Sequence, residues 1–169
     1  MQFEILMDKK ENPRKCTILP LRDRKDFHIR YFHGKRAIPA FQSEVLLHMD
    51  GENLADITPH SIHSLALIDC IWRRVEPTLK KVEGPTPRLV KIPPGFITAY
   101  PRKNKQGNDP EGGLATIEAL FIAASFLGIW DESLLEKYHF KNEFLELNKD
   151  LWEKYSLGNY GTVAKTKLS

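Results

Sequence analysis

The stretch from Ser64 to Arg74 constrains this chain most, because it places an acid, an indole and two cations after an apolar run. Leu65–Ile68 has the length and composition of a strand that is covered on both faces. Asp69 ends the run, and Trp72 follows it with two arginines. In open α/β sheets the carboxyl ends of the strands form the ligand crevice. The stretch favours either a small-molecule site beside an anion-binding surface or a buried strand with a capping acid and a core indole, and it leaves both open.

The composition describes a globular chain with no disulfide framework. The 169 residues, 41% of them apolar, are enough for one domain or two small lobes with a sizeable core. Cys16 and Cys70 offer neither a disulfide pattern nor a paired metal-ligand spacing, which fits a reducing cytosol. The first residues lack a cationic and an apolar region, and no apolar run has the length of a membrane span. We therefore expect a cytoplasmic protein without a signal peptide, a membrane anchor or a bound metal.

The charges are segregated along the chain, although the net charge is only +3. Residues 9–36 carry ten Lys and Arg against three acids, and residues 71–105 carry nine against two. The segment between them holds five acids and no Lys or Arg, and residues 106–156 hold ten acids against four bases. If the two basic segments meet in space, they form a phosphate-binding face, which favours nucleic acid as a partner. The alternative is a set of solvated loops with scattered lysines.

The hydrophobic pattern predicts a small α/β layer followed by an all-helical third. Short β-rich runs predict the strands, and one bounding signal among them is the turn dipeptide Asp50-Gly51. The expected strands are Gln2–Met7, Phe27–Phe32, Glu44–Met49, Leu65–Ile68 and Phe96–Tyr100. Short helical turns are expected within 56–64 and after Trp72. Longer helices are expected at Ala115–Leu127, from Asp131 to Tyr138, and at Lys141–Ser156.

Several polar and aromatic residues of the predicted helical segments have either a structural or a functional interpretation. Glu118 near the start of its helix complements the helix macrodipole, and the Gly112-Gly113 entry lets backbone amides approach a ligand. His60 and His63 lie three residues apart, but no further ligand is evident, so the sequence does not predict a metal site. In the last helix, Trp152 falls on the apolar stripe and is expected in the core.

Several ordered pieces of the chain resemble one known family, the aminocarboxypropyltransferases that modify small-subunit ribosomal RNA during ribosome maturation. No single piece is specific, but their order and spacing are. The matching pieces are Lys15-Cys16-Thr17, Asp56, Ile68–Trp72, Arg88, Phe96–Pro101, Leu114–Ala119 and Phe144–Asn148.

The chain also departs from the family pattern in its loops. Ile18-Leu19-Pro20 stands where the family has Gly-Lys, and Ile71 precedes the indole where the family has Ser. The family's Asn-Pro-Val-Asn-Tyr-Gly loop is replaced by the longer, more basic Tyr100–Gly107. Since loop changes alter a substrate more easily than a fold, a member acting on another RNA is compatible with these departures.

The resemblance implies a SPOUT-like fold with a deep trefoil knot, a rare exception to unthreaded topology. Residues 1–100 would form a parallel-stranded lobe that binds RNA and the donor, and residues 101–169 a helical lobe that completes the donor pocket. The donor would be S-adenosylmethionine, which would give its 3-amino-3-carboxypropyl group, and not its methyl group, to a ring nitrogen of a pseudouridine-type base. The resemblance further implies a monomer that works on small-subunit ribosomal RNA or the pre-ribosomal particle.

The same resemblance assigns roles to individual residues. Thr17 would hold the donor's carboxylate, Trp72 would form the wall against its methyl group and sulfonium, and Asp69 would take the proton of the base. The backbone of Ile68 and Asp69 would hold the ribose. Four further residues would enclose the adenosine: Ile92, Gly112, Leu114 and Thr116. The cations expected on RNA phosphates are Lys15, Arg22, Arg88, Arg102, Lys103 and Lys105.

Two other functions fit the same residues. A non-enzymatic RNA-binding assembly factor would keep the basic face and lose affinity for the donor. A methyltransferase on the same scaffold would turn the donor's methyl group toward the base, and its by-product would be S-adenosylhomocysteine in place of methylthioadenosine.

Overall fold

The computed structural model describes residues 1–10, 12–101 and 113–160, and its centre is a parallel sheet of five strands in the order β2-β1-β4-β3-β5. The strands are β1 (Gln2–Asp8), β2 (Phe27–Phe32), β3 (Val45–Asn53), β4 (Ser64–Asp69) and β5 (Arg88–Lys91). All four ladders are parallel, so the carboxyl ends of the strands share one edge of the sheet. The α/β architecture with a parallel sheet predicted from the sequence is confirmed.

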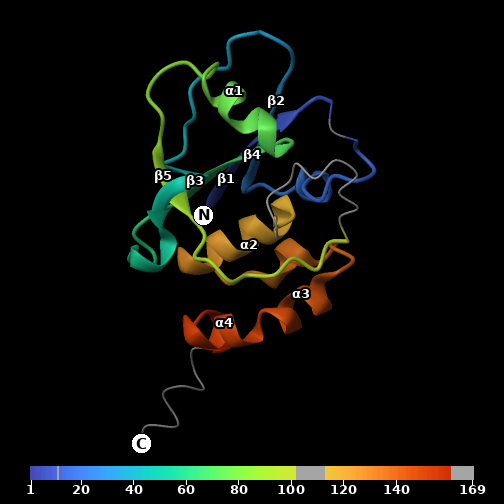
Figure 1. Cartoon of the computed structure of the whole chain (residues 1–169), viewed down its shortest axis with the longest axis vertical. Coiled ribbons are helices and arrows are strands. Elements are labelled where there is room, and N and C mark those ends of the chain that lie inside the picture. The colour runs from blue at the N-terminus through green and yellow to red at the C-terminus, as the bar shows by residue number, and fades with distance from the viewer. Residues whose placement is uncertain (11, 102–112, 161–169) are drawn as a thin grey trace, which may run out of the picture.

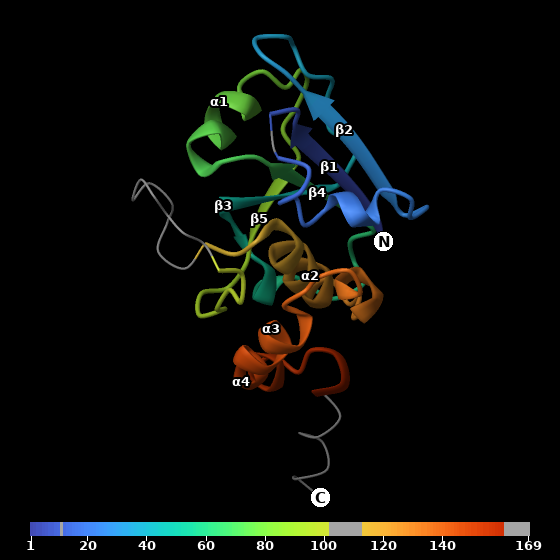
Figure 2. The same cartoon turned by 90° about the vertical axis from the view of Figure 1, so that its right-hand side faces the viewer.

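Helices cover the two faces of the sheet unequally, as Figures 1 and 2 show. The short α1 (Val75–Leu79) lies on one face, over a small core that includes Leu6, Phe32 and Ala66. The longer α2 (Thr116–Phe126) lies on the other face, and α3 (Lys141–Leu147) and α4 (Lys149–Lys154) lie beyond it. The larger core continues from the sheet through α2 to the last helices.

The central strand β1 is buried on both faces, although its sequence alternates apolar and polar residues. Phe3, Ile5 and Met7 join the larger core, as their spacing predicts. The intervening Glu4 and Asp8 are also buried, at 4% and 2% exposure. Each of these acids is paired, Glu4 with Arg30 of β2 and Asp8 with Arg74, because a buried carboxylate is stable only with a partner. The burial of these acids depends on the neighbouring strand and on α1, which the local pattern does not contain.

Two strand predictions were wrong. Asp50-Gly51 was expected to end the third strand, but β3 runs through it to Asn53, with a register shift against β5 between Leu47 and Glu52. Gly51 is required there, since an added Cβ would overlap the backbone of Val90. The fifth strand is Arg88–Lys91 and not Phe96–Tyr100, which has no regular structure. The backbone at 97–99 is held by side chains from the helical third instead.

The helices after Thr116 lie where the sequence predicts them, but the last predicted helix is divided into two. Asp131 caps the 3₁₀ helix η4 (Glu132–Leu135) by accepting from the Ser133 amide, and Trp152 is fully buried. The expected helix Lys141–Ser156 is divided at Asn148, whose side-chain amide binds the Ile97 carbonyl and the Phe144 carbonyl. A side chain that bonds to backbone elsewhere competes with helix continuity, which explains the division. In the part of the chain that is described, no helix has both the length and the apolar character needed to cross a bilayer.

One of the two predicted short helical turns is found where it was expected. Within 56–64 only Asp56 is helical, as the last residue of the 3₁₀ helix η2 (Leu54–Asp56), which Asn53 caps. After β4, the 3₁₀ helix η3 (Trp72–Arg74) leads into α1, as expected for the segment after Trp72.

Candidate functional site

Three segments that are far apart in the sequence meet at Asp69, the last residue of β4. The Thr116 hydroxyl, at the start of α2, donates to Asp69 Oδ1 at 2.6 Å. The Cys16 thiol, from the loop after β1, lies 3.5 Å from Asp69 Oδ2 and donates to it. Both carboxylate oxygens therefore accept a hydrogen bond from a different element, and the carboxylate is fixed at the carboxyl edge of the sheet. Asp69 and Thr116 were both predicted as site residues, and the structure brings them together.

Thr17 joins the same cluster through the first turn of α2. Its hydroxyl oxygen accepts from the Ile117 amide at 3.3 Å. The first amides of a helix have no partner within the helix, and they carry the positive end of its dipole. The amino end of α2 therefore faces Thr17 and Asp69, so this corner of the molecule favours negative charge. Among the predicted donor-binding residues, Thr17, Asp69 and Thr116 form one constellation.

Cys16 is part of this constellation, although the sequence pattern assigned it no role beyond its place in the Lys15-Cys16-Thr17 motif. Burial, and then the negative charge of Asp69, raise the pKa of the Cys16 thiol to about 11. The thiol therefore stays protonated near neutral pH and acts as a hydrogen-bond donor to Asp69. A buried thiol beside a carboxylate is a poor nucleophile, because only the thiolate reacts.

Glu118 organises the backbone next to this cluster. It is fully buried, and its Oε2 accepts from the Ala115 amide at 2.8 Å and from the Thr98 hydroxyl at 2.6 Å. Its Oε1 accepts from the Ala99 amide and the Tyr138 hydroxyl, both at 2.8 Å. This carboxylate ties the 98–99 segment, the start of α2 and the helical third to one point. The sequence suggested only a helix-dipole role, and the four donors could not be foreseen because three of them lie at least nineteen residues away.

The strands β3 and β4 separate before β4 reaches Asp69. The β3–β4 ladder consists of Val45 and Leu46 against Leu65 and Ala66, so beyond Ala66 the strand β4 forms no ladder with another described strand except β1. The backbone at Ile68 and Asp69 thus borders a divergence between neighbouring strands, as a ligand crevice of an open α/β sheet does. Trp72 follows in η3 and is half-buried, so its indole is not sealed in the core as Trp152 is.

The other residues predicted to bind the donor are Ile92, Leu114 and Gly112. Ile92, just after β5, and Leu114, just before α2, are half-buried against the larger core. Gly112 lies outside the described residues.

The predicted RNA-binding cations do not share one location. Lys15 and Arg22 are exposed in the loop between β1 and β2, and Arg22 lies 3.7 Å from Asp23. Arg88 begins β5 opposite Val45, which is the amino edge of the sheet, and its Nε donates to Glu52 at 3.0 Å. In β4 the residue opposite Val45 is Leu65, and Asp69 follows it by four residues. Asp69 is therefore about 13 Å from the level of Arg88 along the strand direction. Arg102, Lys103 and Lys105 lie outside the described residues.

The two basic segments, 9–36 and 71–105, meet on the face of the sheet that α1 covers. This contact is the condition for a shared phosphate-binding face. Arg74 pairs with Asp8, and its guanidinium lies 5.6 Å from the centre of the Phe32 ring. Lys81 donates to the Gly34 carbonyl at 2.8 Å. Arg74 and Lys81 thus bind groups of the protein itself, while other cations of the two segments remain exposed at the surface.

One group in the described part of the chain has metal-ligating side chains: His48, Asp50 and Glu76. The Asp50 amide donates to His48 Nδ1 at 3.2 Å, so Nε2 carries the proton and donates to Glu76 at 2.7 Å. Both ring nitrogens are therefore used in a hydrogen-bonded link between β3 and α1. His60 and His63, considered from the sequence, do not belong to this group.

Comparisons with known proteins agree with this description. Residues 45–166 match the model of a family described as "Ribosome biogenesis protein, C-terminal". The fold is similar to the structure of the SAM-dependent rRNA:acp-transferase Tsr3 from Vulcanisaeta distributa, with a TM-score of 0.57 and 24% sequence identity over 91% of this chain and 82% of that chain. No curated protein matches the chain.

Proposed function

Because the chain belongs to the family described as "Ribosome biogenesis protein, C-terminal", we propose that it transfers the 3-amino-3-carboxypropyl group of S-adenosylmethionine to ribosomal RNA. The acceptor is a ring nitrogen of a pseudouridine-type base in the small-subunit RNA. The observation that carries the proposal is the constellation of Thr17, Asp69 and Thr116, in which three separate segments meet at the carboxyl edge of the sheet. The likeness in fold to an rRNA acp-transferase supports the same reaction.

The residues around Asp69 suit the donor. The divergence of β3 and β4 leaves the backbone of Ile68 and Asp69 available to ribose hydroxyls. The amino end of α2 beside Thr17 suits the carboxylate of the methionine chain, because helix amides and the helix dipole both favour an anion. A half-buried Trp72 offers an apolar face to the methyl group and a cation–π contact to the sulfonium.

The chemistry asks the protein mainly for positioning. The base nitrogen bonds to the γ-carbon, the bond from that carbon to sulfur breaks, methylthioadenosine leaves with the electron pair, and the nitrogen loses a proton. Because the sulfonium already makes the carbon electrophilic, holding nitrogen and carbon in line supplies much of the acceleration. In this proposal Asp69 accepts the proton, and its hydrogen bonds from Thr116 and Cys16, which fix the carboxylate, support that role.

The helical third contributes by holding the backbone that faces the donor. Tyr138 donates to Glu118, and Asn148 binds both the amide and the carbonyl of Ile97. The chain is therefore divided, in this proposal, into an α/β lobe at 1–100 and a helical lobe at 101–169 that completes the donor pocket. The SPOUT-like trefoil knot, with Ile92, Gly112 and Leu114 around the adenosine, is part of the same proposal.

RNA is held by cations of the two basic segments. Lys15 and Arg22 are exposed on the loop that carries Thr17, so phosphates near the reacting base lie within their reach. Arg102, Lys103 and Lys105 are proposed to contribute from the following loop. A contact from Arg88 requires the RNA to extend to the amino edge of the sheet and the ion pair with Glu52 to open. We propose that the protein works as a monomer in the cytoplasm and without a metal, and Cys16 and Cys70, which form no disulfide, suit that compartment.

The decisive experiment is incubation of the protein with labelled donor and small-subunit ribosomal RNA, followed by mass spectrometry of the thioether by-product and of the RNA. We expect methylthioadenosine and RNA heavier by one aminocarboxypropyl group. S-adenosylhomocysteine and methylated RNA would indicate a methyltransferase. RNA binding without donor binding would indicate an assembly factor.

A further inference from the structure

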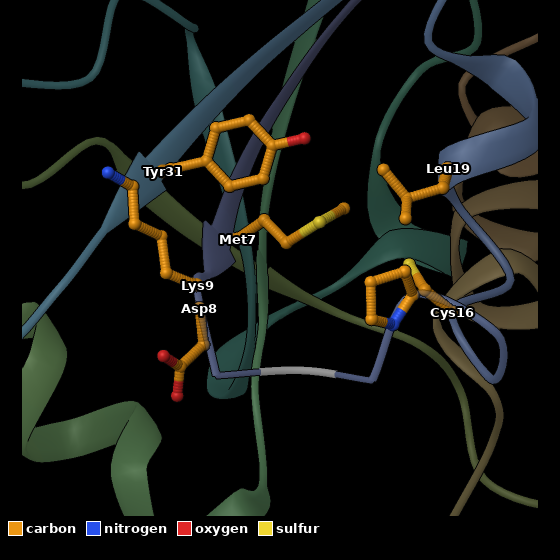
Figure 3. Close-up of a pocket in the computed structure, with 7 residues that line it drawn as sticks. Met7, Asp8, Lys9, Cys16, Leu19 and Tyr31 are labelled. Atoms are coloured by element: carbon orange, nitrogen blue, oxygen red, sulfur yellow. The ribbon is translucent and has the colours of Figure 1, made fainter.

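A cavity of about 220 Å³ opens at the carboxyl ends of β1 and β2, beside the proposed reaction site. Its walls are Met7 and Lys9 at the end of β1, Tyr31 of β2, and Pro13, Cys16 and Leu19 from the loop between them. Figure 3 shows the Tyr31 ring beside Met7, with Leu19 and Cys16 across from them. The lining is mostly apolar, and the cavity belongs to neither the donor crevice nor the core.

A second cavity, of about 420 Å³, adjoins the first. The two share Pro13, Cys16 and Leu19, and the second is extended by Arg14 and Arg22. Together they form one groove with an apolar floor, a lysine at one end and two arginines at the other. We call this the β1–β2 groove.

Tyr31 is unusual among the aromatic side chains, because half of its surface, 50%, is exposed. It lies on β2, the edge strand of the sheet. An exposed ring beside a cavity with cations around it is the arrangement that proteins use to stack an unpaired base and hold the adjoining phosphates.

The charges of the groove favour an anionic occupant. Asp8 also borders the cavity, but its carboxylate pairs with Arg74 and accepts from the Lys10 amide at 3.0 Å. In Figure 3 it points away from Tyr31 and Leu19. Asp23 lies beside Arg22. Lys9 and Arg14 are exposed and form no ion pair with another described residue, so the groove has a net positive charge.

The groove is continuous with the proposed reaction site through Cys16. This side chain lines both cavities, and its sulfur lies 3.5 Å from Asp69 Oδ2. The Cys16 side chain therefore stands between a flat group seated against Tyr31 and the carboxylate that would accept a proton.

We propose that the β1–β2 groove seats one unstacked nucleotide of the acceptor RNA, with its base on the Tyr31 ring and its flanking phosphates on Lys9 and Arg14. This inference rests on the proposed function, which requires a base out of its stack near Asp69. It adds the acceptor side of the site and a residue, Tyr31, that distinguishes RNA binding from donor binding.

The test compares Tyr31→Ala with Tyr31→Phe and with Leu147→Ala, a control that removes a similarly exposed apolar side chain from α3. Measured quantities are the affinity for a labelled small-subunit RNA fragment, KM for that RNA, and donor affinity by calorimetry. We expect Tyr31→Ala to weaken RNA affinity and raise KM at least about fivefold, which is the size of one lost base–aromatic stack. Tyr31→Phe should recover most of the loss, and donor affinity should stay unchanged.

The flanking cations are tested by the salt dependence of RNA binding. Lys9→Ala with Arg14→Ala should lower the slope of log affinity against log salt by about 1.4 units, as expected for two lost phosphate contacts on a single strand. Lys149→Ala, an exposed lysine of α4, is the charge control and should leave the slope unchanged.

The possible failures are distinguishable. If wild-type protein forms no thioether by-product but binds RNA, the proposed reaction fails, and the Tyr31 and Lys9 variants still decide the groove by affinity. RNA affinity within twofold of wild type for Tyr31→Ala overturns the inference, whether or not the reaction occurs. A loss of donor affinity in that variant also overturns it, because the groove would then hold the donor.

Discussion

The two edges of the sheet use their polar side chains differently. At the amino edge, charged groups are bound to one another or to turn backbone. Glu44 accepts from the His63 and Ser64 amides, and Arg24 bridges Asp26 and Asp131. At the carboxyl edge, Asp69 is bound only by neutral donors, and Lys9 and Arg14 form no ion pair with a described residue. The amino edge stabilises the fold, while the carboxyl edge combines one internal ion pair, Asp8 with Arg74, with charges that stay available to a ligand.

The pKa shifts follow the same division. At the amino edge the Arg24 hydrogen bond lowers the pKa of Asp26. For Asp131, burial raises the pKa, but hydrogen bonds from Ser133 and Arg24 outweigh burial and lower it. At the carboxyl edge burial and the charge of Asp69 raise the pKa of Cys16. Hydrogen bonds thus lower the pKa of two carboxyls at the amino edge, while burial beside Asp69 raises the pKa of a thiol at the carboxyl edge.

The largest expected effect is that of Asp69→Asn on the rate. Asparagine can still accept the Thr116 hydrogen bond but cannot take a proton, so kcat should fall by a factor of about 100 or more. Single-turnover transfer to RNA measures this, with Glu44→Gln at the amino edge as the control. A rate within a factor of two of wild type would remove Asp69 from the chemistry and with it the functional contrast between the edges.

Trp72→Ala should weaken donor binding at least about tenfold, because it removes the apolar and cation–π wall of the crevice. Calorimetry with S-adenosylmethionine measures this, and RNA affinity should change far less. Unchanged donor affinity would place the donor away from η3.

Arg24→Met should lower the free energy of unfolding by about 1–2 kcal/mol near neutral pH and leave kcat of the folded protein unchanged. In the wild type, Asp26 and Asp131 have lowered pKa values, so their contribution is present above the ordinary carboxyl pKa and is lost as pH falls through the folded values. Urea denaturation between pH 7 and pH 3 should therefore show a flatter profile for the variant. An equally steep profile would mean that the amino edge does not supply this stability.

The effect expected to be smallest near neutral pH concerns Cys16. Its pKa of about 11 leaves about one thiol in a thousand ionised at pH 8, so alkylation should be slow, and Asp69→Asn should accelerate it by removing a negative charge. Since the folded state holds this proton more tightly than the unfolded chain, stability should decline between pH 9 and about pH 11, and Cys16→Ala should remove that decline. Peptide mapping by mass spectrometry and denaturation at these pH values measure both. Rapid alkylation of Cys16 in the native protein would contradict the described environment.

Much of the site was predictable because it follows from local patterns. The apolar run before Asp69 predicts a buried strand with an acid at its carboxyl end, and the apolar segment after Leu114 predicts a buried helix. The meeting of Thr17, Asp69 and Thr116 was implied only by the resemblance to the aminocarboxypropyltransferase family, because Thr17 lies in a loop and Thr116 begins a helix. The strand at Arg88–Lys91 could not be predicted, because its few residues have no distinct period and its pairing depends on the bulge at Gly51.

By itself, the sequence determined the parallel α/β layer, the helical third and the residues at the end of β4, because hydrophobic period and chain order act locally. Only the tertiary structure decided which charges are neutralised. Arg74 pairs with Asp8, Arg30 with Glu4 and Arg88 with Glu52, each across at least 26 residues. Such pairs form wherever packing brings an acid and a cation together, buried for Asp8 and Glu4 and exposed for Glu52, and spacing along the chain carries no information about them. The β1–β2 groove has the same origin, since Tyr31 and Cys16 face each other only after two strands and their connecting loop have packed.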